Sequence, residues 1–572
     1  MKFDYSKRIK FLAFISVLFA AILITRLFVI QIVGGEEFGE MAERQYSKPM
    51  PDIFSRGSIF FREKSGNLVS AATLKTNFVL AINPTTLGDS KEIFSKIKEF
   101  VIFDEDVFLE KASKKNDTYE VVGEIKDEDA YNNIRELNIK GIYVYREKIR
   151  FYPSGNLASH VLGIVAKSKE DGEKFIGRYG LEKKYEDILH RDNESIYVNF
   201  FAEIFSNIKK TILGDGAEMS GDIVSSIEPT VEGVLEKELA TVKEKWEGES
   251  VAGIIMEPKT GRVIGMAALP DFDPNNFGKE KSVAVFRNPL VEDVFEMGST
   301  MKPLTVAAGL DAKVITAETT YNDKGYVELN GKRINNFDSK ARGIVDIQSA
   351  LGNSLNAGMV FIMQKLGEKK FSDYMLSYGL GERTGIDLPG EPKGLVKNLT
   401  SKYEVDYATA SFGQGIAVTP IAMATALSSL GNGGFLVTPS VVDSVDYKIG
   451  AEIDTKKSEG KRILSQKTSE EITRMLVKVV DENLLGGVVK LKNYSVAAKT
   501  GTALLLDGKG GYYKDRYLHS FFGYFPAYDP KFLVFLYTVD PKGVQYASHS
   551  LTEPFFNIAK FLISYYDVPP DR

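Results

Sequence analysis

The chain has 572 residues, of which 44% are hydrophobic and 26% are charged, a composition typical of a globular protein with two or three domains. Its 72 basic residues are outnumbered by 77 acidic ones, so it lacks the basic surplus expected of a nucleic-acid-binding protein. The absence of cysteine excludes disulfides, thiolate metal sites and a cysteine nucleophile.

A basic stretch and then an apolar segment open the chain. Residues 11–33 contain only Arg26 as a charged residue, and as a helix they would be about 35 Å long, enough to cross a bilayer. We therefore expect residues 1–10 to be a cytoplasmic tail, residues 11–33 a transmembrane helix, and the rest to lie outside the cell membrane. The alternative is a cleaved signal peptide, but no A-x-A-like cleavage site follows.

Residues 34–221 mix short β-rich runs with charged helical stretches and show no catalytic pattern. The run Arg56-Gly57-Ser58-Ile59, followed by Lys64-Ser65-Gly66-Asn67-Leu68, predicts a structural hairpin. Apolar residues recur at helical spacing over residues 196–213, for which we favour a packing helix over an interfacial one.

Residues 222–572 show elements of more regular length, and the fold class they indicate is α+β. Helical patterns cover residues 232–246 and 553–566, and strand patterns cover residues 251–256, 262–268, 494–506, 518–525 and 532–539. Strands at both ends of a mainly helical region imply one antiparallel sheet built from both ends of the domain.

Ser299 is followed three residues later by Lys302, at the start of an apolar helix predicted over residues 303–312. Residues i and i+3 lie on one face of a helix, so the Lys302 amine can reach the Ser299 hydroxyl. A serine nucleophile needs a base, and a lysine serves when burial or a second cation lowers its pKa. Lys499 is a candidate for that second cation.

Two further motifs follow in the chain. Ser354-Leu355-Asn356 comes after Gly352-Asn353 and is expected on a loop, where the Ser354 hydroxyl relays a proton and the Asn356 amide holds substrate. Lys499-Thr500-Gly501-Thr502 lies in a predicted strand, where Gly501 lets a substrate backbone pair with the strand. Lys499 and the two threonines can bind a carboxylate, and a strand N–H can join that of Ser299 in an oxyanion hole.

Each motif alone is weak evidence. S-x-x-K recurs at Ser95, Ser206 and Ser458, K-T-G at Lys259, and S-x-N at Ser65 and Ser154. Only Ser299, Ser354 and Lys499 occur in this order and in suitable local settings. The four histidines, His160, His190, His519 and His549, show no metal-ligand spacing, so we expect no metal and no cofactor. For His519 we favour packing on a strand over catalysis.

The three motifs together resemble those of penicillin-binding proteins and serine β-lactamases. The wider sequence is similar to the class B penicillin-binding proteins over most of the chain. The further matching positions are Arg56-Gly57 with Gly66, Gly180-Leu181-Glu182, Glu257-Pro258-Lys259-Thr260-Gly261, Phe272-Asp273-Pro274-Asn275, Phe412-Gly413-Gln414-Gly415 with Thr419-Pro420, and His519-Ser520-Phe521. The resemblance implies one N-terminal transmembrane helix, an elongated pedestal of the dimerisation type over residues 34–221, and a transpeptidase domain over residues 222–572 with a five-stranded antiparallel sheet flanked by helices.

The resemblance also implies an activity, that of a peptidoglycan D,D-transpeptidase inhibited by β-lactams. Ser299, Lys302, Ser354 and Lys499 would be catalytic, Asn356, Thr500, Gly501 and Thr502 would bind substrate, and the amides of Ser299 and Thr502 would form the oxyanion hole. The implied partners are stem peptides, β-lactams, the lipid bilayer and a polytopic membrane glycan-strand polymerase, with the division (septal) branch favoured over the elongation branch.

Three departures from the family pattern are Met297 for the usual Pro, Met301 for Phe and Glu228 for Asp. None removes a reacting group. The alternative functions are a D,D-carboxypeptidase, in which water replaces the acceptor amine, and a non-catalytic β-lactam sensor or wall-assembly scaffold. A silent scaffold would be free to lose Lys302 or Lys499, and both are present. A β-lactamase fits less well, because those enzymes are usually soluble and shorter.

Overall fold

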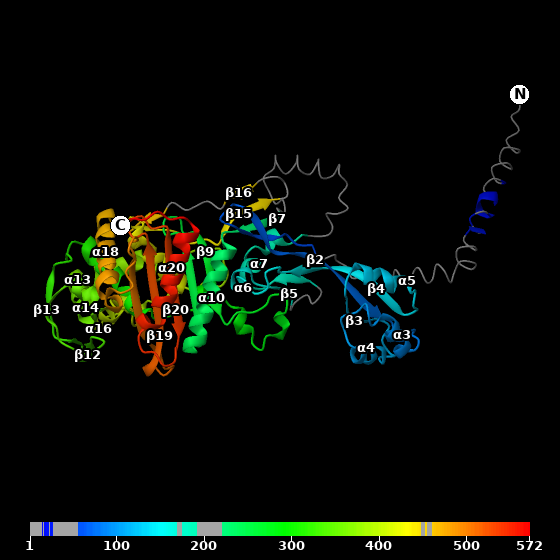
Figure 1. Cartoon of the computed structure of the whole chain (residues 1–572), viewed down its shortest axis with the longest axis horizontal. Coiled ribbons are helices and arrows are strands. Elements are labelled where there is room, and N and C mark those ends of the chain that lie inside the picture. Colours follow the sequence, from blue (N-terminus) through cyan, green and yellow to red (C-terminus); the bar gives the residue numbers. More distant parts are fainter. Residues whose placement is uncertain are drawn as a thin grey trace, which may run out of the picture. The chain divides into compact units, whose positions relative to one another are not determined.

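The structure, a computed structural model, describes residues 55–168, 174–191, 220–447, 452–454 and 460–572, together with residues 14, 17–21, 23, 25 and 26 (Figure 1). The chain forms two compact units. The first contains Leu74–Ile149, and the second contains Arg56–Thr73, Arg150–Arg191 and the described residues from 220 onward. The predicted domain limits at residues 34–221 and 222–572 stay a prediction.

The predicted transmembrane helix falls largely on residues outside those that the structure describes. The few described residues between 11 and 33 are helical. No helix among the described residues is long and apolar enough to span a membrane. The helix predicted over residues 196–213 also lies outside the described residues.

The first unit packs three helices against three strands. The end of β2 (Leu68–Ile82) pairs with β3 (Glu120–Ile125) and β4 (Ile142–Phe151), and α3 (Ser90–Ile97), α4 (Glu105–Ala112) and α5 (Glu128–Glu136) supply the rest of its core. Asp89 and Asp127 are the N-cap residues of α3 and α5, and their carboxylates accept hydrogen bonds from first-turn N–H groups. The apolar sides of all six elements meet in one cluster around Leu80, Ile97 and Phe108.

In the second unit, the hairpin predicted around residues 56–68 is confirmed. β1 (Ile59–Arg62) pairs antiparallel with the start of β2 and parallel with β7 (Gly221–Ser225), which pairs with β15 (Val442–Tyr447) and that in turn with β16 (Glu452–Asp454). Smaller elements nearby are α6 (Ser159–Leu162), β5 (Val165–Lys167), β6 (Phe175–Gly177), α7 (Gly180–Lys184) and α8 (Glu186–Leu189).

A buried ion cluster joins two sequence motifs that lie 126 residues apart. Arg56 Nε donates to Glu182 Oε2 at 2.6 Å, and Arg150 Nε donates to the other carboxylate oxygen at 2.6 Å. Arg56 also contacts Glu186 at 2.7 Å. Although burial lowers the pKa of Arg56, the two glutamates outweigh that effect and raise it, so the guanidinium keeps its charge.

A separate sheet of the second unit is five-stranded and antiparallel throughout, as predicted. Its order is β18 (Ala497–Leu506), β19 (Tyr512–Phe525), β20 (Phe532–Val539), β8 (Ser250–Met256) and β9 (Val263–Leu269). All eight residues of β20 are buried, because this central strand is covered on both faces. Two strands from the start of the domain and three from its end thus form one sheet.

Two helices from opposite ends of the domain cover one face of this sheet (Figure 1). α10 (Pro229–Trp246) and α20 (Thr552–Tyr565) bury Leu235, Leu239, Phe555 and Ile558 against it. Helices of the middle region supply the other core. They are α11 (Pro289–Glu292), α12 (Lys302–Asp311), α13 (Ile347–Gly352), α14 (Asn356–Leu366), α15 (Glu368–Ser377), α16 (Glu404–Ala410), α17 (Pro420–Gly431) and α18 (Gln466–Lys478), with the short strands β10 (Thr320–Asp323), β11 (Tyr326–Leu329), β12 (Lys332–Asn335), β13 (Gly343–Asp346), β14 (Phe435–Leu436) and β17 (Lys461–Arg462).

One predicted boundary is wrong in an informative way. β19 begins at Tyr512, well before the predicted start at residue 518. Residues 512–515 are exposed, so the alternation of apolar and polar residues that marks a half-buried strand is missing there. The hairpin with β18 therefore extends beyond the apolar core.

We expect Glu182→Gln to destabilise the second unit by about 3–5 kcal/mol, because it removes the carboxylate that two buried guanidinium groups share and leaves Arg56 with Glu186 alone. Thermal unfolding of the full chain in detergent, read by circular dichroism, measures the effect. Asp373→Asn breaks the exposed Lys369–Asp373 pair and should leave the unfolding midpoint unchanged. Equal midpoints for Glu182→Gln and wild type would contradict the structural role assigned to the cluster.

Candidate active site

Ser299 lies on a short 3-10 turn, Gly298–Met301, that runs directly into α12. Pro303 is accommodated in the first turn of α12, where its missing N–H has no helical partner. The Lys302 N–H bonds to the Ser299 carbonyl, and the Lys302 side chain is buried, only 1% exposed. Ser299 is half-exposed, and its hydroxyl forms no hydrogen bond with another described residue.

This turn lies directly against β18, and glycines make the approach possible. Gly298 has φ +58°, and a Cβ there would lie 3.2 Å from the Thr502 carbonyl. A Cβ on Gly501 would lie 2.7 Å from the Met297 carbonyl and would overlap the Ser520 hydroxyl. Gly501 was predicted to admit a substrate backbone, and that role stays a prediction. The structure adds another reason for glycine, since any side chain would push the Ser299 turn away from the strand.

Hydroxyl groups fix the start of the turn to the sheet. The Met297 carbonyl accepts hydrogen bonds from Thr300 Oγ1 at 2.8 Å and from Ser520 Oγ on β19 at 3.1 Å. Gly298 N–H donates to the Gly413 carbonyl at 3.1 Å, so the glycine loop around residue 413 closes the turn from another side. Thr300 was not predicted, because the importance of the Met297 carbonyl that it binds depends on the distant Ser520.

Ser354 lies in the loop between α13 and α14, as predicted, with a left-handed backbone at φ +56°. Such a conformation in a non-glycine residue is strained and is concentrated at functional sites. Asn356 was also predicted on the loop, but it is the first residue of α14. Its side-chain amide donates to the Asn335 carbonyl at 2.9 Å, and the N–H of Ala357 binds Asn336, so β12 and the residue after it fix the start of this helix.

The structure brings Lys302, Ser354 and Lys499 together around one hydroxyl. Lys302 Nζ donates to the Ser354 carbonyl at 2.5 Å and to Ser354 Oγ at 3.1 Å. Lys499 Nζ donates to the same Oγ at 3.1 Å and to the Thr500 carbonyl at 3.0 Å. Two N–H donors thus occupy both lone pairs of the Ser354 hydroxyl, which leaves its own proton free to be donated.

Burial makes the two lysines unequal in charge. It lowers the pKa of Lys302 well below its ordinary 10.5, and the neighbouring charge of Lys499 lowers it further. Burial lowers the pKa of Lys499 to about 8. Of the two, Lys302 thus gives up its proton the more readily, because the charge of Lys499 adds to the effect of burial.

The remaining predicted residues lie on β18 beside this group. Gly501 is buried, whereas Thr500 and Thr502 are half-buried. Thr502 Oγ1 accepts a hydrogen bond from the N–H of Ala547 at 3.1 Å, which connects the strand to α19 (Ala547–Ser550). In the described part of the chain, no strand pairs with the edge of β18 opposite β19, so that edge can receive an extended peptide.

The other described copies of the motifs do not form such a group. Ser95 is exposed on α3 and bonds within that helix. Lys259 is exposed and pairs with Asp529. His519 is buried on β19, as expected, with its ring nitrogens near Ser550 Oγ at 2.8 Å and the Gln545 carbonyl at 3.1 Å.

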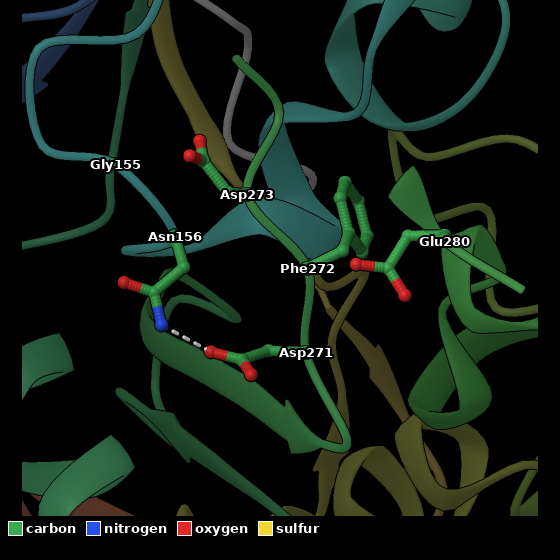
Figure 2. A pocket seen from close by; sticks show the side chains of 6 residues that line it. All are labelled: Gly155, Asn156, Asp271, Phe272, Asp273 and Glu280. Carbon is green, nitrogen blue, oxygen red and sulfur yellow. Dashed lines mark hydrogen bonds between the residues drawn. The ribbon is translucent and has the colours of Figure 1, made fainter. Parts of the chain in front are cut away.

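A pocket of about 360 Å³ lies elsewhere in the second unit and contains none of the predicted site residues (Figure 2). It is lined by Gly155, Asn156, Asp271, Phe272, Asp273 and Glu280. Two of its three carboxylates have structural partners: Asp271 accepts from the Asn156 amide, and Asp273 accepts from the Asn276 amide at 2.6 Å. Within the described residues, no group of three or more histidines or carboxylates is placed to hold a metal ion.

Comparison with known proteins places both parts of the chain. Residues 251–559 match the penicillin binding protein transpeptidase domain, and residues 54–211 match the penicillin-binding protein dimerisation domain. The chain is 31% identical over 550 residues to stage V sporulation protein D of Bacillus subtilis (strain 168). That alignment covers 94% of this chain and 82% of that protein.

Two further proteins extend the comparison. The peptidoglycan D,D-transpeptidase FtsI of Escherichia coli (strain K12) is 27% identical over 435 residues, 75% of this chain and 69% of that protein. Among solved structures, penicillin binding protein 3 of Mycobacterium tuberculosis, complexed with aztreonam, aligns with a TM-score of 0.67 at 20% identity. That alignment covers 91% of this chain and 98% of that one, and it shows a shared fold.

The unequal lysines predict a bell-shaped dependence on pH for the rate at which a β-lactam acylates Ser299. The rate should rise with pH as Lys302 loses its proton, at a pH far below 10.5, and fall through about pH 8 as Lys499 loses the charge that binds the β-lactam carboxylate. Acylation rates measured from pH 5 to pH 10 test this. Lys499→Arg keeps its charge at high pH and should lose the alkaline limb. An unchanged alkaline limb in that variant would contradict the assignment.

Proposed function

The chain belongs to the class B penicillin-binding proteins, and we propose that it cross-links peptidoglycan stem peptides through an acyl-enzyme on Ser299. It is a serine-type peptidoglycan D,D-transpeptidase, with stem peptides as substrates and β-lactams as inhibitors. The observation that carries the residue assignment is the meeting of Lys302 and Lys499 at the Ser354 hydroxyl, next to the turn that presents Ser299.

In the first half-reaction, Ser299 Oγ attacks the carbonyl carbon of the penultimate D-Ala. Lys302 takes the hydroxyl proton, because its buried amine is neutral and keeps a lone pair while its two N–H groups bind Ser354. The peptide bond to the terminal D-Ala breaks, and its nitrogen receives this proton from Lys302 through the Ser354 hydroxyl, so that Lys302 is neutral again. The product is an ester between Ser299 and the donor stem, together with free D-Ala.

In the second half-reaction, the amine of another stem peptide attacks that ester. The amine loses a proton to Lys302, the ester bond breaks, and Ser299 recovers its hydroxyl proton. The contact between Gly298 and the backbone of Thr502 supports an oxyanion hole made by the N–H groups of Ser299 and Thr502. Asn356, Thr500, Gly501 and Thr502 orient the donor along the free edge of β18, and the Lys499 ammonium binds a carboxylate.

The chain's place in the cell belongs to the same proposal. Residues 11–33, apolar apart from one arginine, would anchor it in the cell membrane as a single span with its N-terminus in the cytoplasm. The catalytic domain would then face the peptidoglycan outside. A polytopic glycan-strand polymerase is the partner this arrangement suits, because newly made strands must be cross-linked close to where they emerge. The names of the relatives, a D,D-transpeptidase FtsI and a sporulation protein, support septal synthesis.

Mass spectrometry of the full chain, purified in detergent and incubated with benzylpenicillin, tests the acyl-enzyme. We expect a stable penicilloyl adduct on Ser299 and none on Ser299→Ala. Lys302→Met should reduce the acylation rate by about 10²-fold or more, because the base is lost while the side-chain volume is kept.

The acceptor distinguishes the alternatives. With a stem-peptide donor and an amine acceptor, a transpeptidase gives the cross-linked dimer, whereas a carboxypeptidase gives only the shortened donor. Folded chain that forms no penicilloyl adduct would overturn the acyl-enzyme and favour a silent scaffold.

A further inference from the structure

Glu296 lies three residues before Ser299 and joins three segments around the active site. Its carboxylate oxygens accept the hydroxyl of Tyr512 at 2.9 and 3.1 Å, and one of them also accepts the N–H of Gly415 at 3.0 Å. One carboxylate thus holds together the residues before the Ser299 turn, the β18–β19 hairpin, and the glycine loop that contacts Gly298 through Gly413.

The tip of the hairpin is closed by its own hydrogen bonds. The Asp507 carboxylate accepts from the N–H groups of Lys509 at 2.8 Å and Gly511 at 2.9 Å, and the Asp507 N–H donates to the Gly511 carbonyl at 2.9 Å. These bonds hold the loop together. Tyr512 pairs with Leu506 directly beside the loop, so its hydroxyl can fix this end of the hairpin.

Contacts at two places hold the hairpin in position. Arg516 on β19 bonds Asp540 at 2.6 Å and Glu249 at 2.5 Å, which fixes the hairpin to the sheet. The Tyr512 hydroxyl bonds Glu296, which fixes it to the residues that precede Ser299. Glu296 is partly desolvated, and Tyr512 is 38% exposed, so water can replace this hydrogen bond at a modest free-energy cost.

The hairpin matters to the reaction because β18 is both its first strand and the edge of the sheet. Lys499, Thr500 and Thr502 lie on β18, and the strand continues from them to Leu506, next to the loop of the hairpin. A displaced hairpin would shift the end of β18 relative to the turn that carries Ser299. The free edge of β18 would then no longer hold an extended peptide in the right position relative to Ser299.

We propose that Glu296 is a positioning residue for the transpeptidase reaction, which holds the β18–β19 hairpin and the free edge of β18 against the Ser299 turn through the Tyr512 hydroxyl. This inference rests on the proposed acylation of Ser299. Glu296 acts on neither the nucleophile nor the proton. It stabilises the hairpin position in which the substrate can bind.

Tyr512→Phe removes the hydroxyl and keeps the ring, so the hairpin should occupy the competent position less often. A ligand that binds only when the hairpin is in the competent position then binds more weakly, in proportion to the fall in the population of that position. We expect the half-saturating β-lactam concentration for acylation to rise about three- to tenfold, the scale of one partly exposed hydrogen bond to a charged group. The acylation rate at saturation should stay within about twofold of wild type, because the reacting groups are untouched once the ligand is bound.

The experiment measures the acylation rate of the full chain in detergent against the concentration of a chromogenic cephalosporin. Tyr513→Phe is the matched control, since it removes a hydroxyl from the adjacent residue and keeps the ring over which Arg516 lies. It should behave as wild type. Limited trypsin digestion gives a second readout: cleavage after Lys509 or Lys514 in the exposed hairpin should be faster in Tyr512→Phe than in Tyr513→Phe.

A double-mutant cycle with Glu296→Gln tests whether the two side chains act through one contact. The double variant should bind the cephalosporin no more weakly than Glu296→Gln alone. Independent effects that multiply would overturn the inference, as would a half-saturating concentration in Tyr512→Phe equal to that of wild type. If Glu296→Gln does not fold, the Tyr512→Phe comparison decides alone. Wild-type chain that forms no adduct on Ser299 would instead overturn the proposed function on which the inference rests.

Discussion

The site depends on one electrostatic constraint: two buried lysine side chains share the hydroxyl of Ser354. Lys302 and Lys499 each place Nζ 3.1 Å from Ser354 Oγ, and both are almost completely buried. Two buried ammonium groups bound to the same hydroxyl would repel each other strongly. One of them therefore gives up its proton, and the more deeply buried Lys302 does so. The general base proposed for Ser299 would thus arise from the placement of the Lys302 amine, because burial and the neighbouring ammonium lower its pKa.

Holding that arrangement costs stability elsewhere in the domain. Ser354 adopts a left-handed backbone that costs about 1–3 kcal/mol, and the neutral Lys302 occupies a position where an apolar side chain would be easier to bury. The surrounding contacts offset these costs. Gly298, Gly413 and Gly501 let the turn, the glycine loop and β18 approach one another, and the Met297 carbonyl is bound by two hydroxyls. The same sheet and helices that bury the apolar core thus also hold a strained polar site.

The sequence predicted both the sheet and the trio Lys302, Ser354 and Lys499 that the structure brings together, but for different reasons. Strand periodicity placed β8, β9 and β20 almost to the residue, because these strands are buried and their patterns are local. The trio was found from the order of three motifs and from family resemblance, since no local pattern fixes the distance from Ser354 to either lysine. The sequence could not predict contacts between distant positions, such as Arg56 with Glu182, or Glu296 with Tyr512. Asn356 was misplaced because a helix start and a loop end differ by one residue.

The departures from the family pattern show which atoms the site requires. Met297 stands where proline is usual, yet its contribution is a carbonyl oxygen, which either residue supplies, and its φ of −83° is close to that of proline. Met301 is buried at a position where phenylalanine is usual, so it contributes volume. Glu228 caps α10 through the N–H of Val231, as an aspartate also can, and its other oxygen accepts the Tyr565 hydroxyl. Substitution is tolerated where the backbone or side-chain volume carries the interaction. At Ser299, Lys302, Ser354 and Lys499 the side-chain atom itself does, and there the chain keeps the family's residues.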